Sequence, residues 1–327
     1  MKDTQYLSIS SGGTKGIMYF GMLDALEDHM GPGYYEWCSG LKGVVGTSAG
    51  AIATLAVVLQ LTKEQRRRFM DEMADMHNLF NPDVALLVKD FGVEDGRRVR
   101  DLLRRALMTS GLAPECTLRD LKRFLGVEYV TCATDIHHSV PFFFSATHTP
   151  DATVVDAVFA SCSVPFMFTP PKFEGHLLSD GCLSSDYPNL FEEDKTFFVR
   201  LTSRSEDFEI SSWPEFLGAI IFCAVNAQKE KWERICARCD PENVLDITPF
   251  EEVNRMKGFN IEQTEAQAKV LYESGYICTF DHMHHGNPSK RLGEMVSSFM
   301  KMTSSFPEKP PDLMPVSASP TSGIPVE

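Results

Sequence analysis

Long apolar runs are missing from this sequence. The most apolar stretch of its second half, FLGAIIFCAVNA at residues 216–227, contains Asn226 and is shorter than the ~20 residues that a membrane-spanning helix needs. The first residues, MKDTQYLSISSGG, lack the apolar core of a secretory signal. We therefore expect a cytoplasmic protein without a signal peptide or transmembrane segment, whose contact with membranes, where it occurs, is peripheral.

Basic residues are also in the minority. The chain has 31 Lys and Arg against 45 Asp and Glu, which gives a formal net charge of −14. This balance argues against nucleic acid as a partner, because a polyanion would be repelled. Several arginines gather at 97–107, opposite an apolar helix face. Two interpretations stay open for this helix: a surface helix packed on the core, or a face that docks on anionic lipid.

Cysteine spacing gives no sign of a disulfide framework. The nine cysteines, an odd number, are scattered through apolar contexts, which is typical of buried free thiols in a reducing compartment. Cys236 and Cys239 have the spacing of metal ligands, but no second cysteine pair follows them. The sequence favours two free thiols on one helix face over a zinc site, and we expect no metal and no organic cofactor.

The pattern of apolar residues predicts an α/β fold. Two β-prone segments at 5–10 and 41–46 flank a helical pattern at 14–29, an order typical of a βαβ unit with parallel strands. Further strands are expected at 126–135, 140–147, 195–203 and 242–250, and helices at 51–61, 64–80, 97–111, 117–126, 151–162, 215–239 and 261–275. We expect one catalytic domain over 5–285, followed by a Pro-rich extension at 286–327 that is disordered from about residue 304.

A serine lies between two glycines in GVVGTSAG at 43–50. In a strand–turn–helix elbow the nucleophile sits on a tight, strained turn, so the residues two before and two after it must be small. Gly46 and Gly50 meet this need around Ser48, and an apolar helical pattern follows at once. Ser48 at a helix start also brings backbone N–H groups near a developing oxyanion. The pattern predicts a nucleophile.

A second glycine-rich turn, SGGTKG at 11–16, also lies between a strand and a helix. A plain turn and a phosphate-binding loop stay open for it, although it fits neither the dinucleotide fingerprint nor the P-loop. Its Gly-Gly pair suits an oxyanion hole, which needs backbone N–H groups turned into one cavity. Two such turns after adjacent parallel strands would meet at the carboxyl edge of the sheet.

Five segments in this order make the chain resemble the patatin-like phospholipases. SGGTKG resembles the oxyanion loop of that family, GTSAG its nucleophile elbow and SDGC at 179–182 its Asp-Gly motif. DAVFASCSVPFMFTP at 156–170 and GFNIEQTEAQAKVLYESGY at 258–276 resemble the segment before the Asp-Gly motif and the C-terminal helix. The likeness extends over about residues 5–280 and implies a three-layer αβα sandwich with a mostly parallel central sheet, a modified α/β-hydrolase type.

The resemblance also implies roles for individual residues. Ser48 matches the nucleophile, Asp180 of the Asp180-Gly181 motif the acid, Gly12 and Gly13 the oxyanion hole, and Lys15 the basic position of the oxyanion loop, where the family more often has Arg. Two positions depart from the family pattern. Ser11 replaces the first of three glycines, and Cys182 replaces the small residue after Asp-Gly.

The base that takes the proton of Ser48 has two candidate types. An α/β-hydrolase triad runs Ser, then acid, then His, and only His282, His284 and His285 lie late enough in the chain. A Ser–Asp dyad instead makes Asp180 the base, whose apolar flank HLLS suggests burial and a raised pKa. Asp135 and Asp186 are weaker candidates, and Asp180-Gly181 could also be an ordinary hairpin turn. The ordered motifs favour the dyad.

The function that follows is hydrolysis of acyl esters in glycerolipids, of phospholipase A type, through an acyl-Ser48 intermediate. Acyl transfer to another alcohol on the same dyad is an alternative, because acceptor choice depends on water access. A non-catalytic lipid-binding protein is a second rival, although it would need neither Ser48 nor Asp180. The expected partner is a phospholipid or other glycerolipid substrate.

Overall fold

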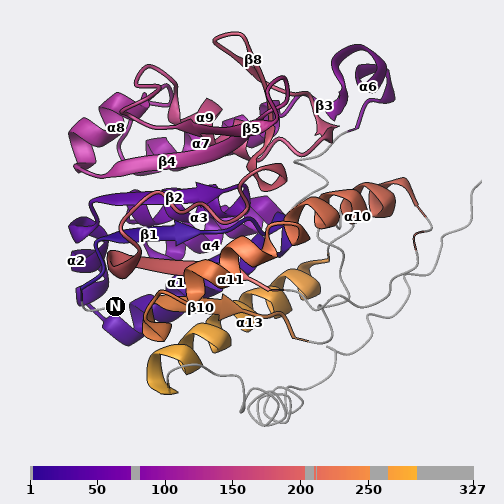
Figure 1. Ribbon diagram of the computed structural model, residues 1–327. Coiled ribbons are helices and arrows are strands. Elements are labelled where there is room, and N and C mark those ends of the chain that lie inside the picture. Colours follow the sequence, from indigo (N-terminus) through magenta and orange to yellow (C-terminus); the bar gives the residue numbers. More distant parts are fainter. Residues whose placement is uncertain (1–2, 75–81, 203–209, 211, 251–263, 286–327) are drawn as a thin grey trace, which may run out of the picture. The chain divides into compact units, whose positions relative to one another are not determined.

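The computed structural model describes residues 3–74, 82–202, 210, 212–250 and 264–285 (Figure 1). The Pro-rich extension and residues 75–80 of the predicted helix at 64–80 lie outside these residues. Within them, the main sheet has eight strands in the order β10-β9-β1-β2-β4-β8-β7, with β5 paired to β4. Its strands are β1 Tyr6–Ile9, β2 Gly43–Thr47, β4 Glu128–Asp135, β5 Val140–Phe144, β7 Lys172–Phe173, β8 His176–Asp180, β9 Thr196–Leu201 and β10 Val244–Ile247.

Parallel and antiparallel pairs divide this sheet into two parts. β10, β9, β1, β2 and β4 run parallel to one another. β5 and β8 run antiparallel to β4, and β7 runs antiparallel to β8. Two short strands outside the sheet, β3 Gly92–Glu94 and β6 Phe166–Phe168, form a parallel pair of their own. The α/β class and the parallel βαβ start are confirmed, and the antiparallel edge completes a mixed sheet.

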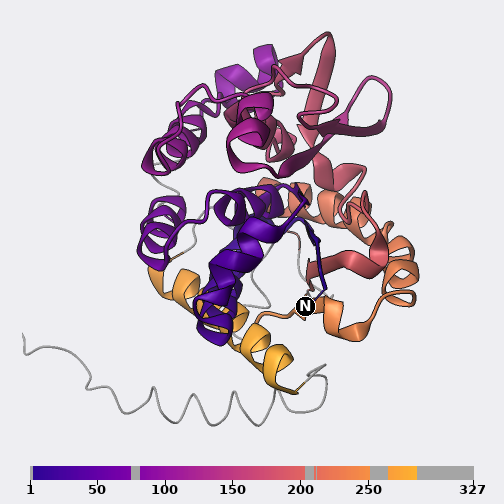
Figure 2. The ribbon, with the colours of Figure 1, turned by 90° about the vertical axis from the view of Figure 1, so that its left-hand side faces the viewer.

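Helices cover both faces of the sheet (Figures 1 and 2). Phe197 and Phe198 are neighbours on β9, so their side chains point to opposite faces. The Phe197 ring contacts His282 of α13, whereas the Phe198 ring contacts Trp232 of α11. α1 packs along α13 and against α3, which completes a three-layer αβα arrangement. The longer helices are α1 Ile17–Met30, α2 Gly33–Gly40, α3 Ala49–Val58, α4 Lys63–Ala74, α6 Val84–Asp90, α7 Arg97–Thr109, α8 Leu118–Leu125, α9 Val154–Ser161, α10 Trp213–Asn226, α11 Lys229–Cys236 and α13 Glu265–His285.

The prediction of a single helix at 215–239 is wrong, because this stretch forms two helices. α10 ends at Asn226 and α11 begins at Lys229. The two helices pack on different apolar clusters: α10 on one that contains Cys182, and α11 on one that contains Phe198. Gln228 lies at the break, where its side chain donates to the Cys182 carbonyl at 2.8 Å and accepts from the Asp186 N–H at 2.7 Å. Tertiary contacts of the linker residue therefore interrupt a continuous helical pattern.

The cysteines are free, as predicted, but their environments vary. Most are buried, whereas Cys223 is exposed. Cys236 is the last residue of α11 and Cys239 lies beyond it, so the expectation of two thiols on one helix face is wrong. No helix in the described ranges combines the length and apolarity needed to span a membrane.

Candidate active site

The register of β4 brings two distant strand ends together. Cys132 of β4 pairs with Thr47, the last residue of β2, while the next residue, Ala133, pairs with Asp180, the last residue of β8. Both Cys132 and Ala133 also pair with β5, so β2 and β8 must share the other edge of β4. The two strands run in opposite directions along this edge and meet end to end, which places Ser48 beside Asp180.

Ser48 occupies a strained turn between β2 and α3. Its backbone has φ 54° and ψ −123°, a left-handed region that costs a non-glycine residue of order 1–3 kcal/mol. A Cβ at Gly46 would lie 2.4 Å from the Gly50 carbonyl oxygen, and a Cβ at Gly50 would lie 2.3 Å from the Ser10 carbonyl oxygen. The two glycines of the GTSAG motif are therefore required by close backbone approach, as the elbow pattern predicts.

The Ser48 hydroxyl donates a hydrogen bond to the Asp180 carboxylate, with 2.7 Å between Oγ and Oδ2. The other carboxylate oxygen, Oδ1, accepts from the Cys182 N–H at 2.9 Å. Asp180 is fully buried, and burial raises its pKa to about 6, against the smaller opposing effects of its hydrogen bonds to Cys182 and Ser48. The Ser48 hydroxyl is therefore hydrogen-bonded to a carboxylate of increased basicity.

Asp180-Gly181 does not form a hairpin turn. It leads from β8 into the 3-10 helix η2 Gly181–Leu183. A Cβ at Gly181 would lie 2.1 Å from the Cys132 carbonyl oxygen, so only glycine fits where the chain passes this close to β4. The side chain of Cys182 packs with Val164 and Leu217, so its size is accommodated by the cluster under α10.

Ser161 is a site residue that the sequence analysis did not single out. Its hydroxyl, at the end of α9, accepts from the Ser48 N–H at 2.9 Å and donates to the Cys132 carbonyl at 2.5 Å. Ser161 thus links the strained turn at Ser48 to β4, the strand whose register brings Ser48 beside Asp180. The available signal was a serine within the apolar run VFASCSV, where a buried hydroxyl needs a partner.

The glycine-rich loop lies directly against the elbow. A Cβ on Gly16 would lie 2.3 Å from Cβ of Ala49, the residue after Ser48. Tyr19 holds the start of the loop, because its hydroxyl donates to the carbonyls of Ser10 and Ser11 at 2.9 Å each. The parallel pairing of β1 and β2 places the two turns side by side at the carboxyl edge of the sheet, as expected. Gly12 precedes the 3-10 helix η1 Gly13–Gly16, and Gly13 has φ 52°.

Two buried ionisable side chains lie in or near this loop. Lys15 is buried, and burial lowers its pKa to about 8. Asp186 is also buried, and burial raises its pKa to about 6, partly offset by hydrogen bonding to Ser11. Asp186 therefore contacts the loop at Ser11, while no hydrogen bond links it to Ser48 in the described part of the chain.

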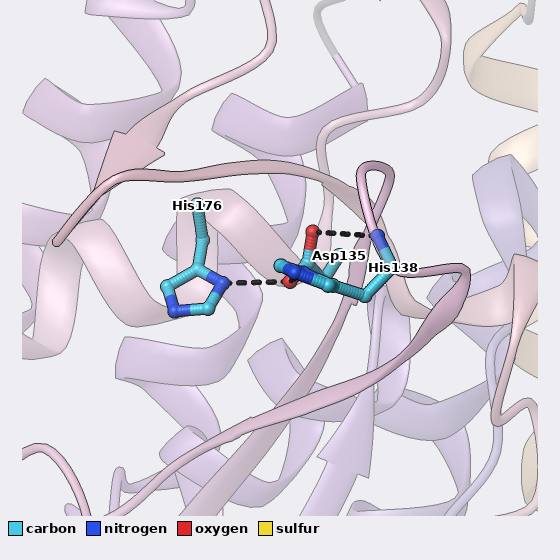
Figure 3. Close-up of side chains that lie close together, drawn as sticks. All are labelled: Asp135, His138 and His176. Atoms are coloured by element: carbon cyan, nitrogen blue, oxygen red, sulfur yellow. Dashed lines mark hydrogen bonds and ion pairs between the residues drawn. The ribbon is translucent and has the colours of Figure 1, made fainter.

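The remaining predicted bases lie elsewhere. His282 Nε2 lies 3.2 Å from the Glu242 carbonyl oxygen, and His284 Nδ1 lies 2.8 Å from the Phe280 carbonyl oxygen. Asp135 contacts two imidazoles (Figure 3). Burial alone would raise the pKa of Asp135, but hydrogen bonds from His176, His138 and two backbone N–H groups lower it below its usual range. Among the described residues, no histidine is hydrogen-bonded to Ser48 or Asp180.

The model of the patatin-like phospholipase family matches residues 7–190, more than half of the 327-residue chain. The chain belongs to the patatin-like phospholipase family. The match begins in β1 and extends beyond the Asp-Gly motif, so it contains both glycine-rich turns and Asp180. Membership of this family supports a lipid hydrolase in general.

The chain is similar in sequence to a curated relative. The chain is 25% identical over 207 residues to an uncharacterised protein, R571, of Acanthamoeba polyphaga mimivirus, and the alignment covers 62% of this chain and 66% of the relative. It thus spans slightly less than two thirds of that protein.

Two solved structures are also similar to this chain, both at low sequence identity. VipD from Legionella pneumophila is 16% identical with a TM-score of 0.54, over 86% of this chain and 67% of VipD. The type III effector protein ExoU is 16% identical with a TM-score of 0.49, over 87% of this chain and 53% of ExoU. At this identity the likeness to VipD supports the patatin-like fold alone.

Proposed function

We propose that this patatin-like protein is a lipid acyl hydrolase of phospholipase A type that works through a Ser48–Asp180 dyad. The observation that carries the proposal is the 2.7 Å hydrogen bond from the Ser48 hydroxyl to a fully buried carboxylate. An ordinary aspartate, with a pKa of ~3.9, is a weak base. Burial raises the pKa of Asp180 to about 6, which improves proton transfer while leaving the carboxylate ionised at neutral pH.

In the acylation step, Asp180 Oδ2 takes the proton of Ser48 as Oγ attacks the ester carbonyl carbon. The tetrahedral intermediate collapses, the bond to the lysolipid oxygen breaks, and Asp180 returns the proton to that oxygen. In deacylation, water gives a proton to Asp180 and attacks the acyl carbon. Ser48 leaves with the proton, and a free fatty acid is released.

The negative charge of the tetrahedral intermediate needs donors beside Ser48. Backbone N–H groups of Gly12 and Gly13 are proposed for this role, because their loop contacts the residues that follow Ser48. The buried cation of Lys15 adds positive potential to the same loop. Its pKa of about 8 leaves the side chain mainly protonated at neutral pH.

Product analysis tests the proposed reaction directly. We expect mixed phospholipid vesicles incubated with the full chain to yield free fatty acid and lysophospholipid in equal amounts, identified by mass spectrometry. Ser48→Ala serves as the inactive control. Transfer of the acyl group to an added alcohol without release of fatty acid would identify an acyltransferase instead. Lipid that binds without any product would contradict the enzymatic proposal.

A lipid surface is proposed to contact the apolar face of α10, made of Trp213, Phe216 and Ile220. Their spacing puts them on one side of the helix, and they are 56%, 46% and 50% exposed. The Trp213 ring also contacts exposed Phe166 of β6 at 5.9 Å. The opposite side of α10 packs on η2, directly after Asp180. Docking through this face would bring lipid next to the turn that carries the base.

The basic helix α7 is a weaker docking face than its arginine count suggests. Arg104 pairs with Asp101 and Glu115, and Arg105 pairs with Glu72. These carboxylates offset much of the positive charge that would attract anionic lipid. Leu102, Leu103, Ala106 and Leu107 are buried, so the apolar side of α7 belongs to the core.

Replacing Trp213, Phe216 and Ile220 together by Ala should weaken binding to phosphatidylcholine vesicles by about 10-fold or more, since each side chain contributes about 1.5–3 kcal/mol when fully buried. Sedimentation with the vesicles measures this, and hydrolysis of a short soluble ester should be unchanged. The matched control is Arg104→Glu with Arg105→Glu, which should have a smaller effect. A larger, salt-sensitive loss in the arginine variant would assign docking to α7.

A further inference from the structure

A second cluster of ionisable side chains lies outside the Ser48–Asp180 pair (Figure 3). Asp135 is the last residue of β4, His138 lies in the turn before β5, and His176 is the first residue of β8. The antiparallel pairing of Asp135 with Leu178 brings β8 alongside β4. The His138 and His176 side chains, 38 positions apart in the sequence, therefore meet on the Asp135 carboxylate.

Both imidazoles approach the same oxygen atom. Nδ1 of His138 and Nδ1 of His176 each lie 2.6 Å from Asp135 Oδ2. One carboxylate oxygen and two imidazole nitrogens, all within 4.8 Å of one another, are a donor set typical of zinc. A small outward movement of the side chains would put all three atoms at coordination distance from one ion.

The groups around the cluster orient its side chains, as neighbouring groups orient the ligands of a metal site. The second oxygen of the carboxylate, Oδ1, accepts from the backbone N–H groups of His137 at 3.0 Å and His138 at 3.4 Å, and such outer hydrogen bonds orient ligands. The His176 ring packs against Phe142, with 5.0 Å between ring centroids. Asp135 is buried, whereas the His138 side chain is 66% exposed, which leaves a route from solvent.

We propose that Asp135 Oδ2, His138 Nδ1 and His176 Nδ1 bind one divalent transition-metal ion, with zinc the best match. Two nitrogen donors disfavour magnesium and calcium, which prefer sites made of oxygen ligands. On binding, each neutral imidazole offers its Nδ1 lone pair and carries its proton on Nε2. Three protein ligands leave a fourth position for water.

The ion has no part in the proposed hydrolysis, and its role follows from where its ligands lie. It would tie the turn after β4 to the first residue of β8, the strand whose last residue is Asp180. A ligand that binds only the folded chain stabilises it in proportion to the logarithm of its concentration over Kd. Zinc bound here should therefore stabilise the part of the sheet that carries Asp180.

Calorimetric titration of the full chain, stripped with a chelator and then supplied with zinc chloride, tests the site. We expect one equivalent to bind and the Tm to rise by about 5 °C at zinc about 100-fold above Kd. His138→Ala and His176→Ala should each weaken binding by more than about 100-fold, since loss of even an outer-shell partner costs 10–100-fold. The matched control is His137→Ala, which removes the neighbouring imidazole and should bind zinc normally.

Circular dichroism establishes that the variants are folded, and the exposed position of His138 makes His138→Ala the least disruptive of them. Unchanged zinc binding in the His138→Ala His176→Ala double variant would place the ion elsewhere, for example at Cys236 and Cys239, and would overturn the proposal. Failure of the folded wild-type chain to bind zinc at micromolar concentrations would also overturn it. Neither outcome bears on the Ser48–Asp180 proposal.

Discussion

Asp180→Asn should reduce turnover by about 10³-fold or more, on the scale seen when a member of a catalytic unit is lost. Asparagine keeps the shape of the side chain but cannot accept the proton of Ser48. The measurement is kcat on a soluble ester, with the fold checked by circular dichroism. The matched control is the triple change of His282, His284 and His285 to Ala, which should keep most activity. An equal loss in the folded histidine variant would replace the dyad by a Ser–Asp–His triad.

Thermal stability separates a catalytic role of Asp180 from a structural one. Its pKa is about 6 in the folded chain and ~3.9 in a model peptide. A group whose pKa is raised by folding contributes stability below its unfolded pKa, and this contribution is lost as the pH rises through about 6. Above that pH the ionised, buried carboxylate costs about 3 kcal/mol relative to low pH, and this figure already includes the favourable effect of its hydrogen bonds. Asp180→Asn should therefore melt no lower than the wild type at pH 8.

The same pKa sets the acid limb of the pH–rate profile. Protonated Asp180 cannot act as a base, so kcat/KM should fall as the pH drops through about 6. Asp180→Asn should lack this limb in its residual activity. A histidine titrates in the same range, so the limb alone does not identify the base, and the variants decide the assignment.

Ser48→Ala should abolish both hydrolysis and labelling by a fluorophosphonate probe. The probe phosphonylates an activated serine, and Ser48 is the hydroxyl bonded to the buried Asp180 carboxylate. Mass spectrometry of the labelled peptide measures the site of attachment. The matched control is Ser184→Ala: this hydroxyl lies just beyond η2 and pairs with that of Thr134 at 2.8 Å, and its loss should leave labelling intact. Labelling that persists in folded Ser48→Ala would assign the nucleophile to another residue.

Several features of the site could be predicted because local chemistry specifies them. A serine at φ 54°, with backbone atoms within 2.5 Å of any Cβ at Gly46 or Gly50, demands glycine two residues before and after it. The five consecutive residues of the GTSAG motif meet this requirement, so the elbow can be predicted from local sequence. The order of the remaining motifs then indicated the family, and the alternation of strand and helix patterns indicated the α/β class.

Other elements could not be predicted from local sequence patterns. The continuous apolar periodicity of 215–239 hides a break, because Gln228 bonds to Cys182 and Asp186 more than 40 residues earlier in the chain. The short strands β3 and β6 carry too few residues for a period to emerge. Ser161 has no motif of its own, since its contribution depends on a backbone N–H 113 residues away.

The sequence by itself determined the family, the strand–turn–helix elbow at Ser48 and the glycine-rich loop beside it, because the elbow and the loop depend on backbone conformations within a few residues. The ordered motifs favoured Asp180 as the partner of Ser48, but only tertiary structure brings the two side chains together, since this requires β2 and β8 to end against consecutive residues of β4. It also decided the raised pKa of Asp180 and the convergence of His138 and His176 on Asp135. Register and desolvation are set by groups distant in the chain, so no local spacing encodes them.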